Sequence, residues 1–150
     1  MQTQMLVRNR PTARLFQRPP HRSVLTELAG MLDLRPAQAM MLGSSRVFPA
    51  ASGMAWRLQF DDSPLRGRSR PCVVLPVAAS DLAGAAVVRL LSAQAQLLSQ
   101  YSLYVGVSPE GWIEFTTLQW YDRANELLSM LEQTLRTVSG LLHALSQDAR

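Results

Sequence analysis

The chain has 150 residues, of which 47% are hydrophobic and 17% are charged. This is enough apolar material for a folded core, so general disorder is excluded. One cysteine and two histidines are too few for an internal disulfide or an ordinary zinc site. No stretch offers the roughly 20 apolar residues that a membrane-spanning helix requires. Composition therefore predicts one soluble domain in a reducing compartment, without a metal or a cofactor.

Charge is distributed unevenly along the sequence. All 15 basic residues are arginines, and five of them lie in residues 1–22, which contain no acid. Residues 23–150 carry ten arginines against eleven acids, a net charge of −1. We interpret residues 1–22, with their three prolines, as a flexible arm. A nucleic-acid-binding arm and an organelle transit peptide are the two alternatives.

The first half of the chain reads as one helix followed by strands. Residues 23–34 show helical spacing of apolar side chains after a Ser23 cap. Residues 37–53 are ambiguous, and one of their short apolar runs is expected to form an edge strand. Residues 54–61 alternate apolar and polar side chains, as a half-buried strand does. Residues 72–75 form the next strand, and Pro76 is expected to mark its end or an edge.

A long apolar helix is predicted from Ser80 or Asp81 to about Gln100. Arg89 is its only charge after Asp81, although a helix that lies on a sheet normally has a polar face. We therefore expect this helix to be covered on two sides, once by its own sheet and once by something else.

The last part of the chain reads as a hairpin and a helix. Two runs of residues that favour strands, 103–107 and 112–120, flank the turn-forming residues 108–111. Asp122 is expected to cap a helix to about residue 146, whose leucine stripe lies along the sheet. The predicted fold class is α+β: a twisted, mainly antiparallel sheet with three helices, in the order α-β-β-β-α-β-β-α. This domain spans residues 23–146, and residues 147–150 form a tail.

The residues with catalytic potential do not combine into a site. His143 shares one helix with Ser139 and Asp148, whereas the groups of a catalytic triad usually converge from separate segments. Cys72 on a strand is interpreted as a small buried hydrophobic residue. The arginines of residues 66–70 are interpreted as a solvated turn, with a phosphate or client contact as the alternative. The sequence therefore predicts no enzyme.

Four stretches resemble one bacterial family. They are Leu25-Thr-Glu-Leu-Ala-Gly-Met-Leu-Asp-Leu34, Trp56-Arg-Leu-Gln-Phe-Asp61, Val88-Arg-Leu-Leu-Ser-Ala-Gln-Ala95, and Val105-Gly-Val107 followed by Gly111-Trp-Ile-Glu-Phe115. In this order they resemble the class I type III secretion chaperones, small proteins that bind effector proteins before export. The chain departs from the family in its basic arm and in the turn at residues 98–102, where the family often carries glycines.

The resemblance implies a non-catalytic homodimer in the bacterial cytoplasm that binds an extended segment of a secreted effector protein. It places client pockets beside the first helix, and we expect client contact at Leu25, Leu28, Met31, Leu32, Trp56 and Leu58. Core packing is the alternative explanation for the leucines of this helix. The dimer interface is expected on the long apolar helix at Val87, Val88, Leu91, Ala95 and Leu98. The second hypothesis is a small α+β protein that binds nucleic acid through its basic arm.

Overall fold

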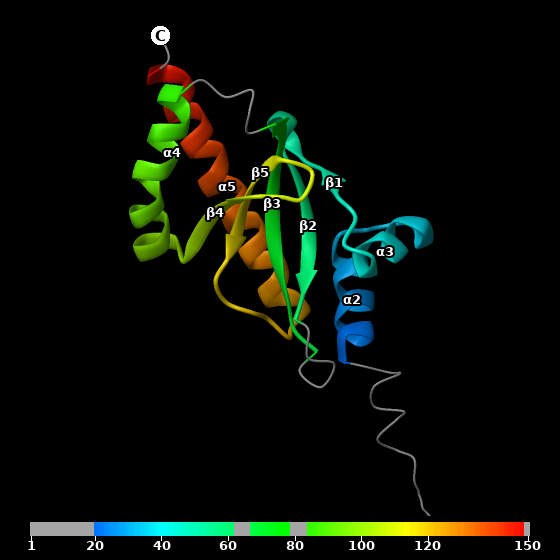
Figure 1. Ribbon diagram of the computed structural model, residues 1–150. Coiled ribbons are helices and arrows are strands. Elements are labelled where there is room, and N and C mark those ends of the chain that lie inside the picture. The colour runs from blue at the N-terminus through cyan, green and yellow to red at the C-terminus, as the bar shows by residue number, and fades with distance from the viewer. Residues whose placement is uncertain (1–19, 62–66, 79–83, 149–150) are drawn as a thin grey trace, which may run out of the picture.

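The computed structural model describes residues 20–61, 67–78 and 84–148, which form four helices and one five-stranded antiparallel sheet (Figure 1). The predicted α+β class is confirmed, and the observed order α-α-β-β-β-α-β-β-α adds one short helix to the prediction. The predicted arm, except for its last three residues, and the start of the long apolar helix lie outside the described residues. The elements are α2 (Pro20–Met31), α3 (Pro36–Gly43), β1 (Phe48–Pro49), the 3₁₀ turn η1 (Ala51–Gly53), β2 (Ala55–Phe60), β3 (Ser69–Ala78), α4 (Gly84–Gln96), the π-helical turn η3 (Leu97–Tyr101), β4 (Leu103–Val107), β5 (Trp112–Thr117) and α5 (Ala124–Asp148).

Helix α2 has different ends from those predicted. It starts at Pro20, so Ser23 lies inside the helix and the prediction of a Ser23 cap is wrong. A proline is favourable in the first turn, because the N–H that it lacks has no partner there. At the other end, Asp33 adopts a left-handed conformation with φ 54°. The N–H of Leu34 then donates to the carbonyl of Ala29 at 3.0 Å, which satisfies one of the last carbonyls of the helix.

The ambiguous residues 37–53 form the extra helix and the edge strand. Pro36 occupies the first turn of α3, and the backbone N–H of Arg35 donates to the side chain of Gln38 at 3.0 Å. This local cap supports a helix of only eight residues, in which Leu42 is the only fully buried side chain. Phe48, the last residue of its apolar run, and Pro49 form β1 at one edge of the sheet, which confirms the expected edge strand.

The sheet has the order β1-β2-β3-β5-β4, with every neighbouring pair antiparallel. Strand β3 runs to Ala78, so Pro76 does not end it, and the other expectation, that Pro76 marks an edge, is the one that holds. Pairing with β2 ends at Val74, and the register against β5 shifts between Leu75 and Ala78. Pro76 therefore lies where β3 has only one neighbouring strand, and a missing N–H is tolerated at such an irregular edge.

Helix α5 packs on one face of the sheet, as its leucine stripe predicted. In Figure 1 it crosses behind the strands, and none of the described helices lies in front of them. The covered face supplies Trp56, Val73 and Phe115, which share one line of the register. They pack with buried side chains of α5, among them Leu131 and Val138. Each such side chain contributes roughly 1.5–3 kcal/mol through burial, so this face holds the core.

Candidate functional site

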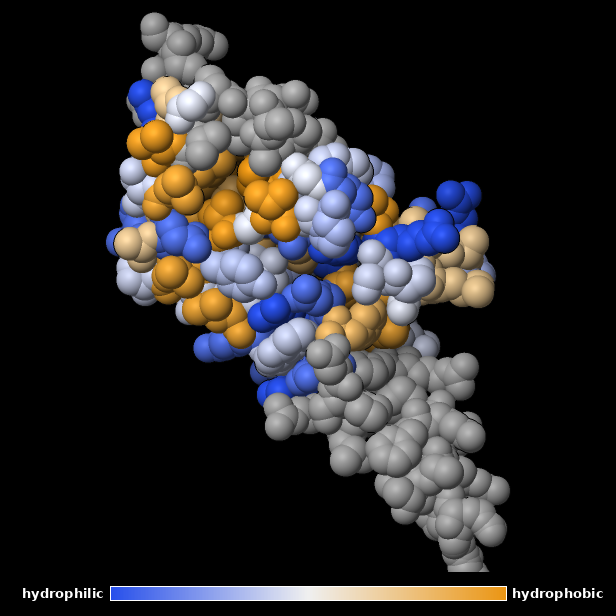
Figure 2. All heavy atoms as spheres, in the orientation of Figure 1, coloured by the Kyte–Doolittle hydropathy of each residue, from blue (hydrophilic) through white to orange (hydrophobic). Residues whose placement is uncertain are grey.

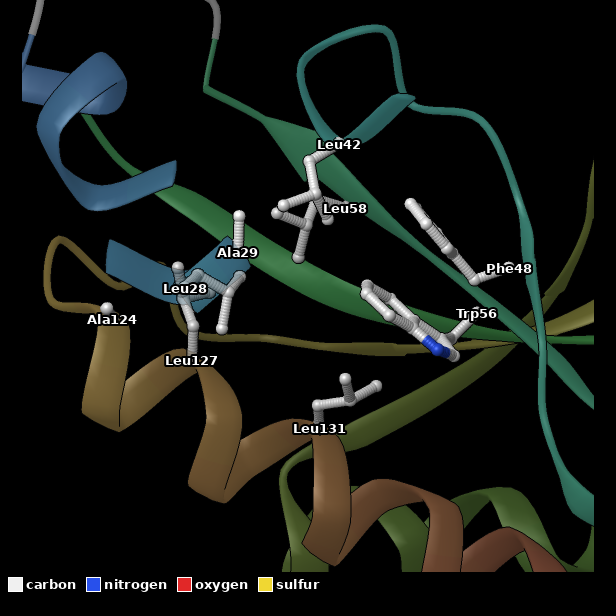
Figure 3. Packing of buried hydrophobic residues seen from close by; sticks show 9 residues of the cluster. All are labelled: Leu28, Ala29, Leu42, Phe48, Trp56, Leu58, Ala124, Leu127 and Leu131. Atoms are coloured by element: carbon white, nitrogen blue, oxygen red, sulfur yellow. The ribbon is translucent and has the colours of Figure 1, made fainter. Parts of the chain in front are cut away.

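Three of the six predicted client-binding residues lie in the core. Leu28 is 1% exposed, and Trp56 and Leu58 are also buried, in a cluster that includes Leu127 of α5 (Figure 3). The ring of Trp56 stacks on Phe48 with centroids 4.6 Å apart. These side chains are already enclosed by their own chain.

The other three predicted client residues reach the surface to different degrees. Leu25 and Leu32 are half-buried and pack against the same cluster, whereas Met31 is 45% exposed. Sequence reasoning missed two further exposed apolar side chains nearby in the chain. Met40 of α3 is 79% exposed, and Val47, just before β1, is also exposed. The run at residues 40–42 was visible in the sequence, but its members differ in burial: Leu42 is buried, Met41 is half-buried against the core cluster and Met40 is exposed.

Helix α4 has two apolar faces. Leu90 and Leu97 are buried against the sheet. This confirms the prediction that the sheet covers one side of the long apolar helix. The second face carries four predicted dimer residues, and all four are exposed: Val88 (62%), Leu91 (70%), Leu98 (37%) and Ala95. We call them the α4 stripe. The side chain of Val87 lies outside the described residues. Figure 2 shows apolar residues gathered over α4 on this side of the molecule.

The two edges of the sheet differ in how far they can accept another strand. In β4, the register turns the N–H groups of Leu103, Val105 and Val107 away from β5. The side chain of Gln94 in α4 accepts from the N–H of Val105 at 2.9 Å, so this edge is partly blocked. In β1, Pro49 lacks an N–H, which is a common protection of an edge strand.

Val47 marks the open part of the β1 edge. Phe48 and Ala50 pair with β2, so the N–H and C=O of Val47 point away from the sheet. Neither group has a hydrogen-bond partner among the residues that the structure describes. An extended peptide could therefore pair with the sheet at Val47.

The face of the sheet opposite α5 is polar. Arg57 of β2 and Glu114 of β5 form an ion pair at 2.7 Å across β3. Arg70 of β3 donates to Gln59 at 2.7 Å, and its guanidinium lies 4.1 Å from the ring centre of Trp120. These long side chains lie over the strands in place of a helix, and hydrophilic residues form a band across this side in Figure 2.

The structure shows partners for two of the three arginines in residues 66–70. Arg68 pairs with Asp61 at 2.6 Å, and Arg70 is held by its contacts on the polar face. Residues 62–66, which include Arg66, lie outside the described part of the chain. Two of the three arginines are thus engaged within the domain, which weakens the case for a phosphate contact at this turn.

Cys72 is fully buried beneath the polar face, as predicted. The hydroxyl of Thr116 donates to its sulfur at 3.5 Å. Burial raises the pKa of the Cys72 thiol above its ordinary value, so the reactive thiolate is disfavoured. His143 is exposed near the end of α5. The described residues contain no group of three or more histidine, cysteine or acidic side chains that could hold a metal ion. They also contain no helix long and apolar enough to cross a bilayer.

Comparison with known proteins yields one structural match. No family model matches the chain, and no curated protein matches its sequence. A solved structure matches over 81% of this chain and 96% of the other, with a TM-score of 0.50 and 19% sequence identity. It is the heterodimeric complex ExoU–SpcU from the type III secretion system of Pseudomonas aeruginosa. The matched chain is SpcU, a type III secretion chaperone.

The two chains share a fold. The resemblance that the four sequence stretches indicated is therefore confirmed at the level of architecture. At this identity the match shows the arrangement of helices and strands alone.

Proposed function

We propose that the chain is a non-catalytic chaperone that binds an extended segment of a secreted effector protein and keeps it competent for export. The shared fold with SpcU, solved in complex with ExoU, carries this proposal. The exposed apolar side chains of α2 and α3 and the open backbone at Val47 support it, because an extended client needs apolar pockets and backbone partners. The proposal places the protein in the bacterial cytoplasm.

Client contact is proposed at the surface residues around α2 and α3 rather than in the core. Met31, Met40 and Val47 are exposed large apolar side chains in this part of the chain. Methionine is unbranched and polarisable, so it adapts to different partners. Leu25 and Leu32 line the boundary between this surface and the core. Leu28, Trp56 and Leu58 then support the binding surface from beneath.

We further propose that the protein is a homodimer through the α4 stripe. Four apolar residues in successive turns of one helix, exposed to water, are typical of a surface that another molecule covers. A two-fold interface places the same stripe on both copies, so one helix face suffices. In this arrangement the second copy would cover the outer side of α4, which the sequence predicted to be covered by something other than the sheet.

Purification from the native bacterium tests the proposal. An affinity-tagged chain should retain one main secreted protein, identified by mass spectrometry, and light scattering should give the mass of a dimer plus client. Met31→Ser with Met40→Ser should weaken client retention while the protein stays folded and dimeric. The rival hypothesis predicts retained nucleic acid that salt removes steeply. Retained nucleic acid without a protein partner would replace the chaperone function with that hypothesis.

A further inference from the structure

A groove of about 390 Å³ opens between the loop after α3 and the tip of the β4–β5 hairpin, at one end of the polar face. Its apolar walls are Met41 and Val47 on one side and Trp112 on the other. Its polar groups come from Ser45, Arg46, Arg57 and Glu110. Apolar and polar side chains therefore line the same groove, whereas a pocket for a purely apolar client segment would need no polar groups.

Arg57 uses only part of its hydrogen-bonding capacity. Its guanidinium carries five N–H donors, and within the described residues one nitrogen, Nη2, bonds to Glu114. The Nε atom is buried without a hydrogen-bond partner among the described residues, and the thiol of Cys72 is a further close neighbour of the guanidinium. The side chain is 19% exposed, so water reaches the guanidinium only in part. An acceptor that entered the groove would gain more from Arg57 than from a fully exposed arginine.

Arg46 adds a second cation to the same groove. Its side chain is exposed, and its guanidinium makes no hydrogen bond or ion pair among the described residues, although its backbone N–H donates to the carbonyl of Met41 at 3.2 Å. The only acid that lines the groove is Glu110, at the tip of the hairpin. Because Arg57 and Glu114 largely neutralise each other, the groove offers free donors and one unpaired positive charge opposite Glu110.

We infer that this groove binds the carboxylate of an aspartate or glutamate in an extended client segment, with apolar residues on either side of that acid. The proposal rests on the chaperone function and adds the chemistry of the segment. A carboxylate accepts from guanidinium groups in two directions, and Met41, Val47 and Trp112 pack against its apolar neighbours. The open backbone of Val47 lies at the wall of the groove, where it pairs with an extended peptide.

A pair of peptides tests the inference. Both carry fluorescein and share a sequence of about 12 residues in which leucine and valine flank the central position. One has glutamate there and the other glutamine. Fluorescence polarisation should show that the wild-type protein binds the glutamate peptide about tenfold more tightly, because a hydrogen bond to a charged group is stronger than one between neutral groups. Emission from Trp112 should change on binding, and Trp112→Phe should remove that change.

Three single substitutions test the separate contributions of Arg57, Arg46 and Glu110 to peptide binding. Arg57→Gln should bind the glutamate and glutamine peptides with about equal affinity. Circular dichroism confirms that this variant is folded. Arg46→Gln changes an exposed residue, which keeps the fold intact, and should reduce the preference about two- to threefold. Glu110→Gln should strengthen binding of the glutamate peptide about two- to threefold, because it removes a like charge. A merely structural role for Glu110 would not give this increase.

Equal affinity for the two peptides would overturn the inference, and so would a Trp112 response to 10 mM inorganic phosphate with neither peptide bound. These outcomes leave the chaperone function standing if the native client still co-purifies. If the protein captured no client but still preferred the glutamate peptide, the result would contradict the chaperone function and leave the inference about the groove standing.

Discussion

Replacing Leu91 by glutamate tests the proposed dimer. In the single chain this side chain is 70% exposed, so a carboxylate there meets water and should change the free energy of unfolding by no more than about 0.5 kcal/mol. In a dimer through the α4 stripe, the same carboxylate would be buried against apolar groups of the second copy. The desolvation penalty for an unpaired ion is several kcal/mol. Two copies at the interface should therefore weaken dimerisation by a factor of more than about 100.

Light scattering after size-exclusion chromatography measures the effect. Wild-type protein at micromolar concentration should elute with the mass of a dimer, and Leu91→Glu with that of a monomer and an unchanged circular dichroism spectrum. Met40→Glu is the matched control, because Met40 is exposed to a similar extent but lies on α3. A Leu91→Glu protein that stays dimeric, or a wild type that is monomeric at high micromolar concentration, would refute the reasoning.

Three further predictions concern stability and reactivity. Leu28→Ala should lower the free energy of unfolding by about 2–5 kcal/mol in urea, because the side chain is fully buried. Met31→Ala should lower it by less than about 0.5 kcal/mol, and equal losses would contradict the boundary drawn between core and client surface. Gly140→Ala should raise the melting temperature, since a Cβ there meets nothing within 4 Å and alanine favours a helix interior by about 1 kcal/mol; a lower melting temperature would show a hidden constraint. The raised pKa of Cys72 means that the unfolded thiol loses its proton first, so stability should fall as the pH rises above about 8.5. Urea titrations at pH 7 and pH 9.5 should show a smaller fall for Cys72→Ala than for wild type, and identical falls would refute this assignment.

The alternating pattern of residues 54–60 predicted β2 and its buried face, because a period of two is a direct consequence of strand geometry. The function assigned to that face did not follow from the pattern. Trp56 and Leu58 face the core beneath α2 and α5, and only the packing of those distant helices decides whether an apolar strand face is core or binding surface. The resemblance implied client contact at Trp56 and Leu58, and both side chains are buried in the core.

The sequence of α4, in which Arg89 is the single charge, was more informative, because a helix with apolar residues nearly all round must be covered on two sides. Leu90 and Leu97 face the sheet, and the α4 stripe faces outward. Helix α3 was not predicted, since an apolar run of three residues fits a strand or a helix equally well. The groove at Arg57 was also beyond sequence reasoning, because it joins residues from a loop, a strand and a hairpin tip that lie far apart in the chain.

Hydrogen exchange on the complex purified from the native bacterium tests the central claim most directly. The account predicts a continuous client segment whose amides exchange slowly while the chaperone is bound and rapidly once it is removed, since the segment has no folded core of its own. The protection should be lost in the Met31→Ser, Met40→Ser variant. A client that is protected equally with and without the chaperone would be a folded domain, and it would contradict the binding of an extended segment.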